Sequence, residues 1–212
     1  MKKQSTMLLL FLLVPAFALT ACISLPFGNK DRAPSSIYTL HASQSSNAES
    51  RAPNRRGATV VVPKPELPAG FDTERIALFL DQGRRLDYYA DAKWSARLDD
   101  LLQDFLIQKA QQDLPGKVVG SPDLAAAKYK LALKVDDFEP VYMDAPDKAP
   151  RLDVAMTVTV VTLPGETVKT QFSVKKSVPA SGNTLTTITN ELGDLLHSVT
   201  DEALQKAAPF LG

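Results

Sequence analysis

The chain has 212 residues, of which 44% are hydrophobic and 23% are charged, an ordinary globular composition that suffices for one domain with appendages. Its 24 basic residues balance 24 acidic residues, which excludes the basic excess typical of a nucleic-acid-binding protein. A single Cys and two His exclude a disulfide framework and a cysteine-rich zinc site, and leave little material for imidazole-based catalysis.

The first 21 residues have the pattern of a secretory signal peptide. Lys2 and Lys3 form a positive start, and residues 7–19 carry no charge. As a helix, this uncharged stretch spans about 20 Å at a rise of about 1.5 Å per residue, short of the hydrocarbon core of about 30 Å. We therefore expect residues 1–21 to be a cleaved signal and not a permanent membrane span.

Residues 19–22, Leu-Thr-Ala-Cys, resemble the bacterial lipobox, in which the Cys receives a diacylglycerol and becomes the first residue of the mature protein. The alternative is an ordinary secreted protein with an accidental free Cys, but the positive start, the apolar stretch and the motif follow in the right order. We expect a diacylglycerol and an N-acyl chain on Cys22, enough for stable membrane attachment, and no other cofactor. Ile23 stands where an Asp usually retains lipoproteins in the inner membrane, which favours the outer membrane, facing the periplasm.

The mature chain is predicted to hold one domain behind a tether. Residues 22–36 contain Pro26, Gly28 and Pro34 and form the predicted lipidated tether, which reaches at most about 50 Å when fully extended. The domain is expected over residues 37–208, with a flexible polar loop at residues 43–57.

Apolar alternation and turn residues predict a set of short and long strands. The turn at Gln82–Gly83 indicates a hairpin, and the turn at Pro164–Glu166 joins two long strands. The predicted strands cover residues 37–40, 58–62, 75–80, 85–89, 128–135, 152–161 and 168–178.

Two segments have the spacing of amphipathic helices. Apolar residues recur at i, i+3, i+4 and i+7 over residues 98–109 and 185–204, with Asn183 as the expected N-cap of the second helix and Pro209 at its end. The expected fold class is therefore α+β: an antiparallel or mixed sheet of four to six strands with two amphipathic helices packed on one face.

Three segments carry a family resemblance. They are residues 62–68 (Val-Pro-Lys-Pro-Glu-Leu-Pro), 71–77 (Phe-Asp-Thr-Glu-Arg-Ile-Ala) and 86–94 (Leu-Asp-Tyr-Tyr-Ala-Asp-Ala-Lys-Trp), with the helix from Leu98 at the expected distance. Together with the lipobox, they make the chain from Tyr38 to Leu204 similar to the ABC-type transport auxiliary lipoproteins, which include the paraquat-inducible protein C-like lipoproteins.

The resemblance implies a non-catalytic, lipid-anchored periplasmic subunit that works with an ABC permease, an ATPase and a mammalian-cell-entry (MCE) domain protein. Such systems move phospholipid or other hydrophobic cargo, and this subunit is expected to dock the transporter at the outer membrane. Two other functions stay open: a stand-alone structural or assembly lipoprotein of the cell envelope without a transport role, and a lipid carrier with its own cavity. A homo-oligomer is compatible with all three.

The candidate partner-binding residues lie on or beside the predicted hairpin and are Arg75, Arg85, Tyr88, Tyr89 and Trp94. Tyr, Trp and Arg are enriched at interface hot spots, which favours a docking surface. The alternative, favoured for Trp94, is internal packing, in which alternate aromatic residues lie under the helix from Leu98 while the others face water. Tyr88 and Tyr89 must face opposite sides if both lie in a strand.

Nothing in the sequence indicates an enzyme. Common nucleophile, phosphate-binding and zinc-protease motifs are absent from the sequence. The acidic groups at residues 99–100, 136–139 and 144–147 are expected to be solvated, because neighbouring acids diverge on a helix or a strand. Residues 137–143 break the strand pattern and are expected to form either an exposed contact loop or a bend that closes over the sheet.

Overall fold

The computed structural model describes residues 35–42, 57–120 and 127–211. The predicted signal peptide, Cys22 and the predicted tether up to residue 34 lie outside these ranges, as do residues 43–56 of the predicted loop.

Three long antiparallel strands form the centre of the sheet: β6 (Tyr129–Val141), β7 (Arg151–Thr162) and β8 (Thr167–Pro179). Their apolar residues alternate with polar residues, so one face of each strand can be buried while the other stays polar. The predicted turn between β7 and β8 is present, with positive φ angles at Gly165 (104°) and Glu166 (49°).

The second edge of β6 is shared by two strands. Its first residues run parallel to β2 (Val60–Val61), which also pairs with β5 (Val118–Val119). Its last residue pairs with β3 (Arg75–Leu80), and beyond β3 follow β4 (Arg85–Trp94) and β1 (Ser36–Tyr38). The described residues thus form an eight-stranded mixed sheet, in which β1, β2 and β5 are only two or three residues long.

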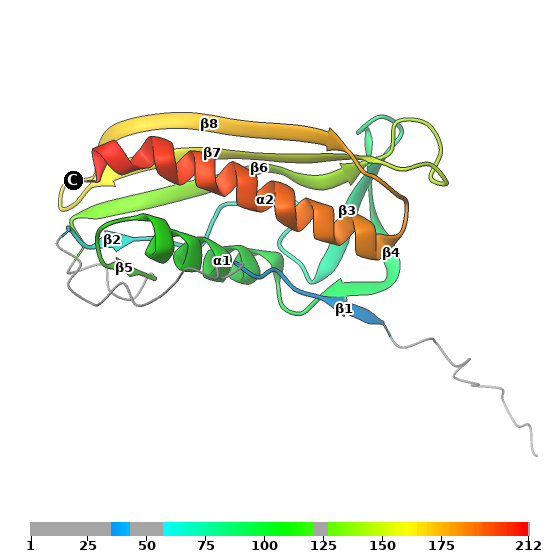
Figure 1. Cartoon of the computed structure of the whole chain (residues 1–212), viewed down its shortest axis with the longest axis horizontal. Helices are drawn as coiled ribbons and strands as arrows, with labels where there is room; N and C mark the ends of the chain where they lie inside the picture. Colours follow the sequence, from blue (N-terminus) through cyan, green and yellow to red (C-terminus); the bar gives the residue numbers. More distant parts are fainter. Residues whose placement is uncertain (1–34, 43–56, 121–126, 212) are drawn as a thin grey trace, which may run out of the picture. The chain divides into compact units, whose positions relative to one another are not determined.

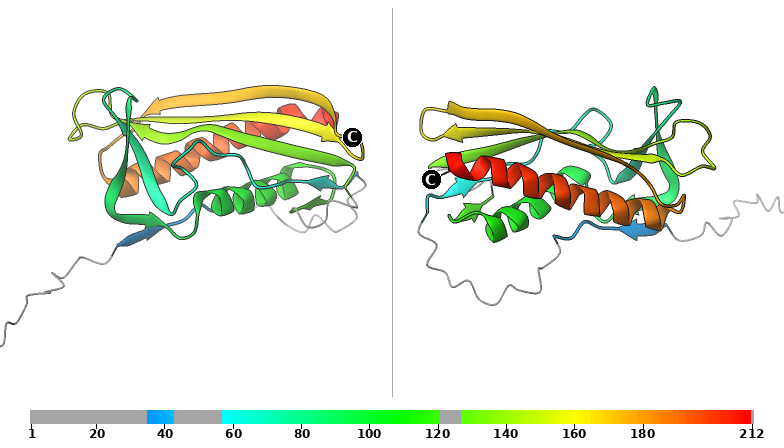
Figure 2. Two further views of the ribbon diagram at one scale, coloured as in Figure 1. Left: turned by 180° about the vertical axis from the view of Figure 1, so that it is seen from behind. Right: turned by 45° about the horizontal axis from the view of Figure 1, so that its top comes forward.

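Two helices complete the fold: α1 (Leu98–Asp113) and α2 (Leu185–Ala207), the latter continued by a short 3₁₀ turn, η2 (Ala208–Phe210). In Figure 1, α2 lies along the long strands with α1 beside it, and the view from behind in Figure 2 places the strands in front of α2. The predicted α+β class with two helices is therefore confirmed.

The start of α2 differs from its prediction. The N-cap is Thr184, whose Oγ1 accepts the N–H of Thr187 at 3.2 Å, and not Asn183. Asn183 instead uses its side chain for contacts with Tyr142 and Pro146. Both residue types cap helices well, so composition alone does not choose between neighbouring positions.

The prediction that residues 137–143 leave the strand is wrong. The pairing of β6 with β7 shifts between Val135 and Asp137, so that one extra residue is accommodated as a bulge and the strand continues to Val141. After the bulge, Phe138 and Tyr142 are buried, and only Met143 at the end of the segment is exposed.

Candidate partner-binding surface

The turn between β3 and β4 presents a charged tip. Asp81, Gln82 and Gly83 have φ angles of 53°, 61° and 86°, which confirms the predicted turn. Arg85 begins β4 and pairs with Asp81 at 3.0 Å and with Asp87 at 3.4 Å. The Arg85 side chain is 57% exposed, so it is accessible to a partner despite these two surface ion pairs.

Arg75 and Tyr88 meet across the hairpin. The Arg75 guanidinium carbon lies 3.7 Å from the centre of the Tyr88 ring, a cation–π contact. The Tyr88 hydroxyl donates to the carbonyl of Gly70 at 3.0 Å, which holds the ring in place. The exposed Arg75 and the half-buried Tyr88 therefore form a preorganised surface site with one cationic and one aromatic side chain.

Tyr89 turns the other way and starts a chain of hydrogen bonds. Tyr142 donates to Asn183 Oδ1 at 2.9 Å, so Tyr89 is the donor in its 3.0 Å contact with the Tyr142 hydroxyl. The Asn183 amide nitrogen then donates to the carbonyl of Pro146 at 2.9 Å. Burial, reinforced by the contact with Tyr142, raises the pKa of Tyr89 and keeps its hydroxyl protonated. This series of hydrogen bonds joins β4, the β6–β7 connection and the start of α2.

Tyr142→Phe is expected to lower the free energy of unfolding by about 1–2 kcal/mol, because it removes two hydrogen bonds of this chain. Tyr89→Phe removes one bond and leaves Tyr142 bonded to Asn183, so about 0.5–1 kcal/mol is expected. Urea unfolding of both variants and of the double variant measures these costs and their coupling. Equal effects of the two single variants would contradict a stabilising contribution from the second bond of Tyr142, to Asn183.

Trp94 does not reach the surface. It is 2% exposed, and its ring centre lies 6.0 Å from that of Phe138 in the core. Packing thus accounts for Trp94, as the alternative interpretation expected. Of the five candidate residues, Arg85 is at the exposed tip, Arg75 and Tyr88 share one contact, Tyr89 supports the neighbouring connection, and Trp94 lies in the core.

Glu139 departs from the expectation that its acidic group is solvated. Asp144 and Asp147 are exposed, but Glu139 and its cross-strand neighbour Asp153 are each only 5% exposed. The bulge in β6 causes this placement, because it puts Glu139 opposite Asp153.

The pKa values of the two buried acids are shifted in opposite directions. Burial raises the pKa of Glu139 to about 7, and the charges of Asp137 and Asp153 add to this effect. Burial also acts to raise the pKa of Asp153, but hydrogen bonds from Arg151 and Ser177 more than offset it and hold that pKa below its usual value. Across the ranges that the structure describes, no three His, Cys, Asp or Glu side chains are grouped to hold a metal ion.

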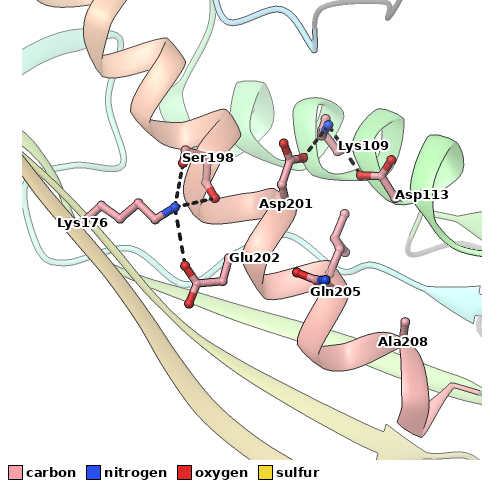
Figure 3. Close-up of a pocket in the computed structure, with 9 residues that line it drawn as sticks. Lys109, Asp113, Lys176, Ser198, Asp201, Glu202, Gln205 and Ala208 are labelled. Carbon is pink, nitrogen blue, oxygen red and sulfur yellow. Dashed lines mark hydrogen bonds and ion pairs between the residues drawn. The ribbon is translucent and has the colours of Figure 1, made fainter. Parts of the chain in front are cut away.

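A shallow pocket of about 900 Å³ extends over the second half of α2 (Figure 3). On the β8 side, Lys176 donates to the Ser198 hydroxyl at 2.7 Å and pairs with Glu202 at 3.5 Å. On the α1 side, Lys109 pairs with Asp201 at 2.6 Å and with Asp113 at 3.5 Å.

The Lys109 ammonium group in this pocket is stabilised by two neighbouring carboxylates. Burial acts to lower the pKa of Lys109, but the hydrogen bond with Asp201 and the charge of Asp113 outweigh burial and raise it. Both lysines of the pocket lining are thus neutralised by acids that also line it. These ion pairs connect α2 to β8 on one side and to α1 on the other. In the sequence, the indication of such a pair is Lys109, a charged residue on the otherwise apolar face of α1.

Comparison with known proteins identifies the family. The sequence profile of the ABC-type transport auxiliary lipoprotein component family matches residues 38–203. The chain belongs to this family. Membership makes it an auxiliary transport lipoprotein and implies attachment to a membrane of the cell envelope. In the described part of the chain, no helix is long and apolar enough to cross a bilayer.

Solved structures share the fold of this family member. Protein XCC0632 from Xanthomonas campestris superposes with a TM-score of 0.66 at 21% identity, covering 82% of this chain and 94% of its own. A second crystal structure, of an uncharacterized protein, gives a TM-score of 0.63 at 11% identity over 82% and 98% of the two chains. The hypothetical protein CT253 from Chlamydia trachomatis gives 0.50 at 8% identity, over 73% and 98%. No curated protein matches the sequence.

Proposed function

We propose that the protein is a lipid-anchored periplasmic subunit that docks an MCE-domain ABC-type lipid transporter at the outer membrane and has no catalytic role. The observation that carries the proposal is the match to the auxiliary lipoprotein family over residues 38–203, which follows a lipobox-like motif that ends at Cys22. Ile23 supports the outer membrane, because it stands where an Asp retains lipoproteins in the inner membrane.

A docking subunit needs a rigid, accessible surface more than it needs a reactive group. The β3–β4 tip offers such a surface, since Arg85 is exposed and the neighbouring connection is held by the hydrogen bonds from Tyr89 through Tyr142 to Asn183. Exclusion of lipid from water is the physical need for such docking, because exposure of each CH₂ group costs about 0.8 kcal/mol. A conduit for lipid therefore requires a firm junction at the receiving membrane.

Arg85→Glu is expected to reduce recovery of the MCE-domain protein at least about tenfold when the lipoprotein is purified from detergent extracts, while the fold is kept. The substitution reverses the charge of the tip and places three acids together at positions 81, 85 and 87. Lys134→Glu is the matched control, because its side chain is 58% exposed and lies on β6, away from the tip. Equal recovery of the MCE-domain protein with the wild type, Arg85→Glu and Lys134→Glu would show that the tip is not the contact surface.

Affinity purification of the wild-type protein from detergent-solubilised membranes tests the function itself. Recovery of a permease, an ATPase and an MCE-domain protein would support the transport role. Recovery of peptidoglycan-associated or barrel-assembly proteins alone would instead assign a stand-alone structural or assembly role. Phospholipid that co-purifies with the unlipidated domain would favour a lipid carrier.

A further inference from the structure

β8 has one backbone edge without a partner strand. Among the described residues it pairs with β7 alone, through 12 of its 13 residues from Thr167 to Pro179; the register shifts at Lys169. An edge strand of this length turns a row of N–H and C=O groups outward, which is a template for another strand.

The lysine side chains of β8 do not block the pairing of another strand with this edge. Natural edge strands often carry lysines that discourage pairing. Here Lys175 reaches back over the sheet to Asp137 at 2.6 Å, and Lys176 reaches to Ser198 on α2 at 2.7 Å. Lys169 lies 5.3 Å from the ring centre of Tyr129, again over the sheet. All three ammonium groups thus contact other parts of the domain, Lys169 and Lys175 over β6 and Lys176 on α2.

Three more polar side chains of β8 contact the neighbouring strand. Gln171 donates to Thr159 at 3.2 Å, Ser173 bonds the hydroxyl of Thr157 at 2.9 Å, and Ser177 donates to Asp153 at 2.5 Å. These partners all belong to β7. These six side chains therefore do not have to be displaced from the free edge before a strand can bind.

A groove of about 300 Å³ lies between the end of β8 and α2. Val178, Pro179 and Leu195 supply its apolar part, and Val178 is 38% exposed. Glu191 and Asp194 also line it, and its lining contains no Lys or Arg. The groove thus combines an apolar seat with two carboxylates.

We propose that the β8 edge and this groove bind an extended segment of a partner polypeptide by strand addition. Backbone hydrogen bonds to β8 supply affinity, and side chains on the α2 side supply selectivity. The position that faces Val178 and Leu195 takes an apolar side chain, and the next position on the same face takes a Lys or Arg beside Asp194. This surface is separate from the β3–β4 tip and does not rest on the transport role.

The probe is a blocked nine-residue peptide with Thr at every odd position and Val and Lys alternating at the even positions, so that Val and Lys share one face. A matched peptide carries Glu in place of Lys. Binding to the lipidated mature protein in detergent is followed by fluorescence anisotropy, and amide hydrogen exchange locates the protected residues. We expect saturable binding of the Lys peptide with protection within residues 170–178, and at least about tenfold weaker binding of the Glu peptide.

Two substitutions and a control make the test specific. Asp194→Lys reverses the charge at an exposed position and Val178→Lys removes the apolar seat; each is expected to weaken the Lys peptide at least about tenfold. Asp144→Lys changes another exposed acid, on the β6–β7 connection, and is expected to leave binding unchanged. Undiminished binding to the Asp194 variant, or protection that avoids β8, would overturn the proposal. Concentration-dependent protection of β8 without peptide would also overturn it, in favour of a second copy of the chain.

Discussion

Replacement of residues 1–22 by a cleavable secretory signal without a lipobox is expected to move the protein almost entirely from the membrane fraction to the soluble periplasm. Acyl chains on Cys22 are the proposed attachment, and two or more chains make attachment stable. Replacement of the whole leader is preferable to Cys22→Ser, because a blocked lipobox can leave the apolar stretch of residues 7–19 uncleaved in the membrane. Cell fractionation, with labelling by a clickable fatty acid, measures the outcome.

Ile23→Asp is the matched control, because it keeps Cys22 and its acyl chains. This variant is expected to stay labelled and membrane-bound but to shift to the inner membrane, which density-gradient separation detects. If the leader-replaced protein still sediments with membranes and fully complements a deletion strain, anchoring through Cys22 is not what places the protein at the envelope.

Glu139→Gln is expected to raise the free energy of unfolding by about 1–3 kcal/mol at pH 8 and to leave it nearly unchanged at pH 4. Burial raises the folded-state pKa of Glu139 to about 7, against a usual value of 4.5. Below pH 4.5 both states are protonated and the glutamate costs nothing. Between pH 4.5 and pH 7 the unfolded chain releases its proton first, so stability falls as pH rises, and above pH 7 the cost is constant.

Urea unfolding of the wild type and the variant at pH 4, 6 and 8 measures this dependence. Glutamine keeps an oxygen that can accept the Phe138 N–H, so the comparison isolates the charge. Asp153→Asn is the opposite control: its carboxylate is stabilised by Arg151 and Ser177, so its loss is expected to destabilise the protein at neutral pH. A gain from Glu139→Gln that is the same at pH 4 and pH 8 would contradict the assignment to ionisation.

Local patterns in the sequence predict the elements well. Residues 75–80 form β3 with the expected bounds, Gln82–Gly83 lie in the turn, and both amphipathic helices are present. The bulge in β6 was not predictable, because one inserted residue only changes the phase of the alternation, and the pairing partner that reveals it lies in β7. The burial of Glu139 follows from that bulge and was missed for the same reason.

In the candidate partner-binding surface, too, some features follow from local sequence patterns and others depend on contacts between distant residues. Period-two alternation correctly places Tyr88 and Tyr89 on opposite faces, and the position of Trp94 before α1 indicates packing. The hydrogen bond between Tyr89 and Tyr142 joins residues far apart in the sequence, so no local pattern contains it. The open edge of β8 depends on which strand ends the sheet, which is a property of topology and not of the strand's own residues.

The position of β1 determines how mechanical load reaches the domain. When Cys22 is held in a bilayer, any pull from that side enters the described structure at Ser35 and reaches β1, which begins at Ser36. β1 is joined to β4 by three residue pairs; in addition, the Ser95 N–H donates to the Tyr38 carbonyl, and the Tyr38 hydroxyl is hydrogen-bonded to that of Thr186. Tension can therefore pass from β1 across its hydrogen bonds into the Ala92–Trp94 end of β4, the strand that begins at Arg85 of the tip.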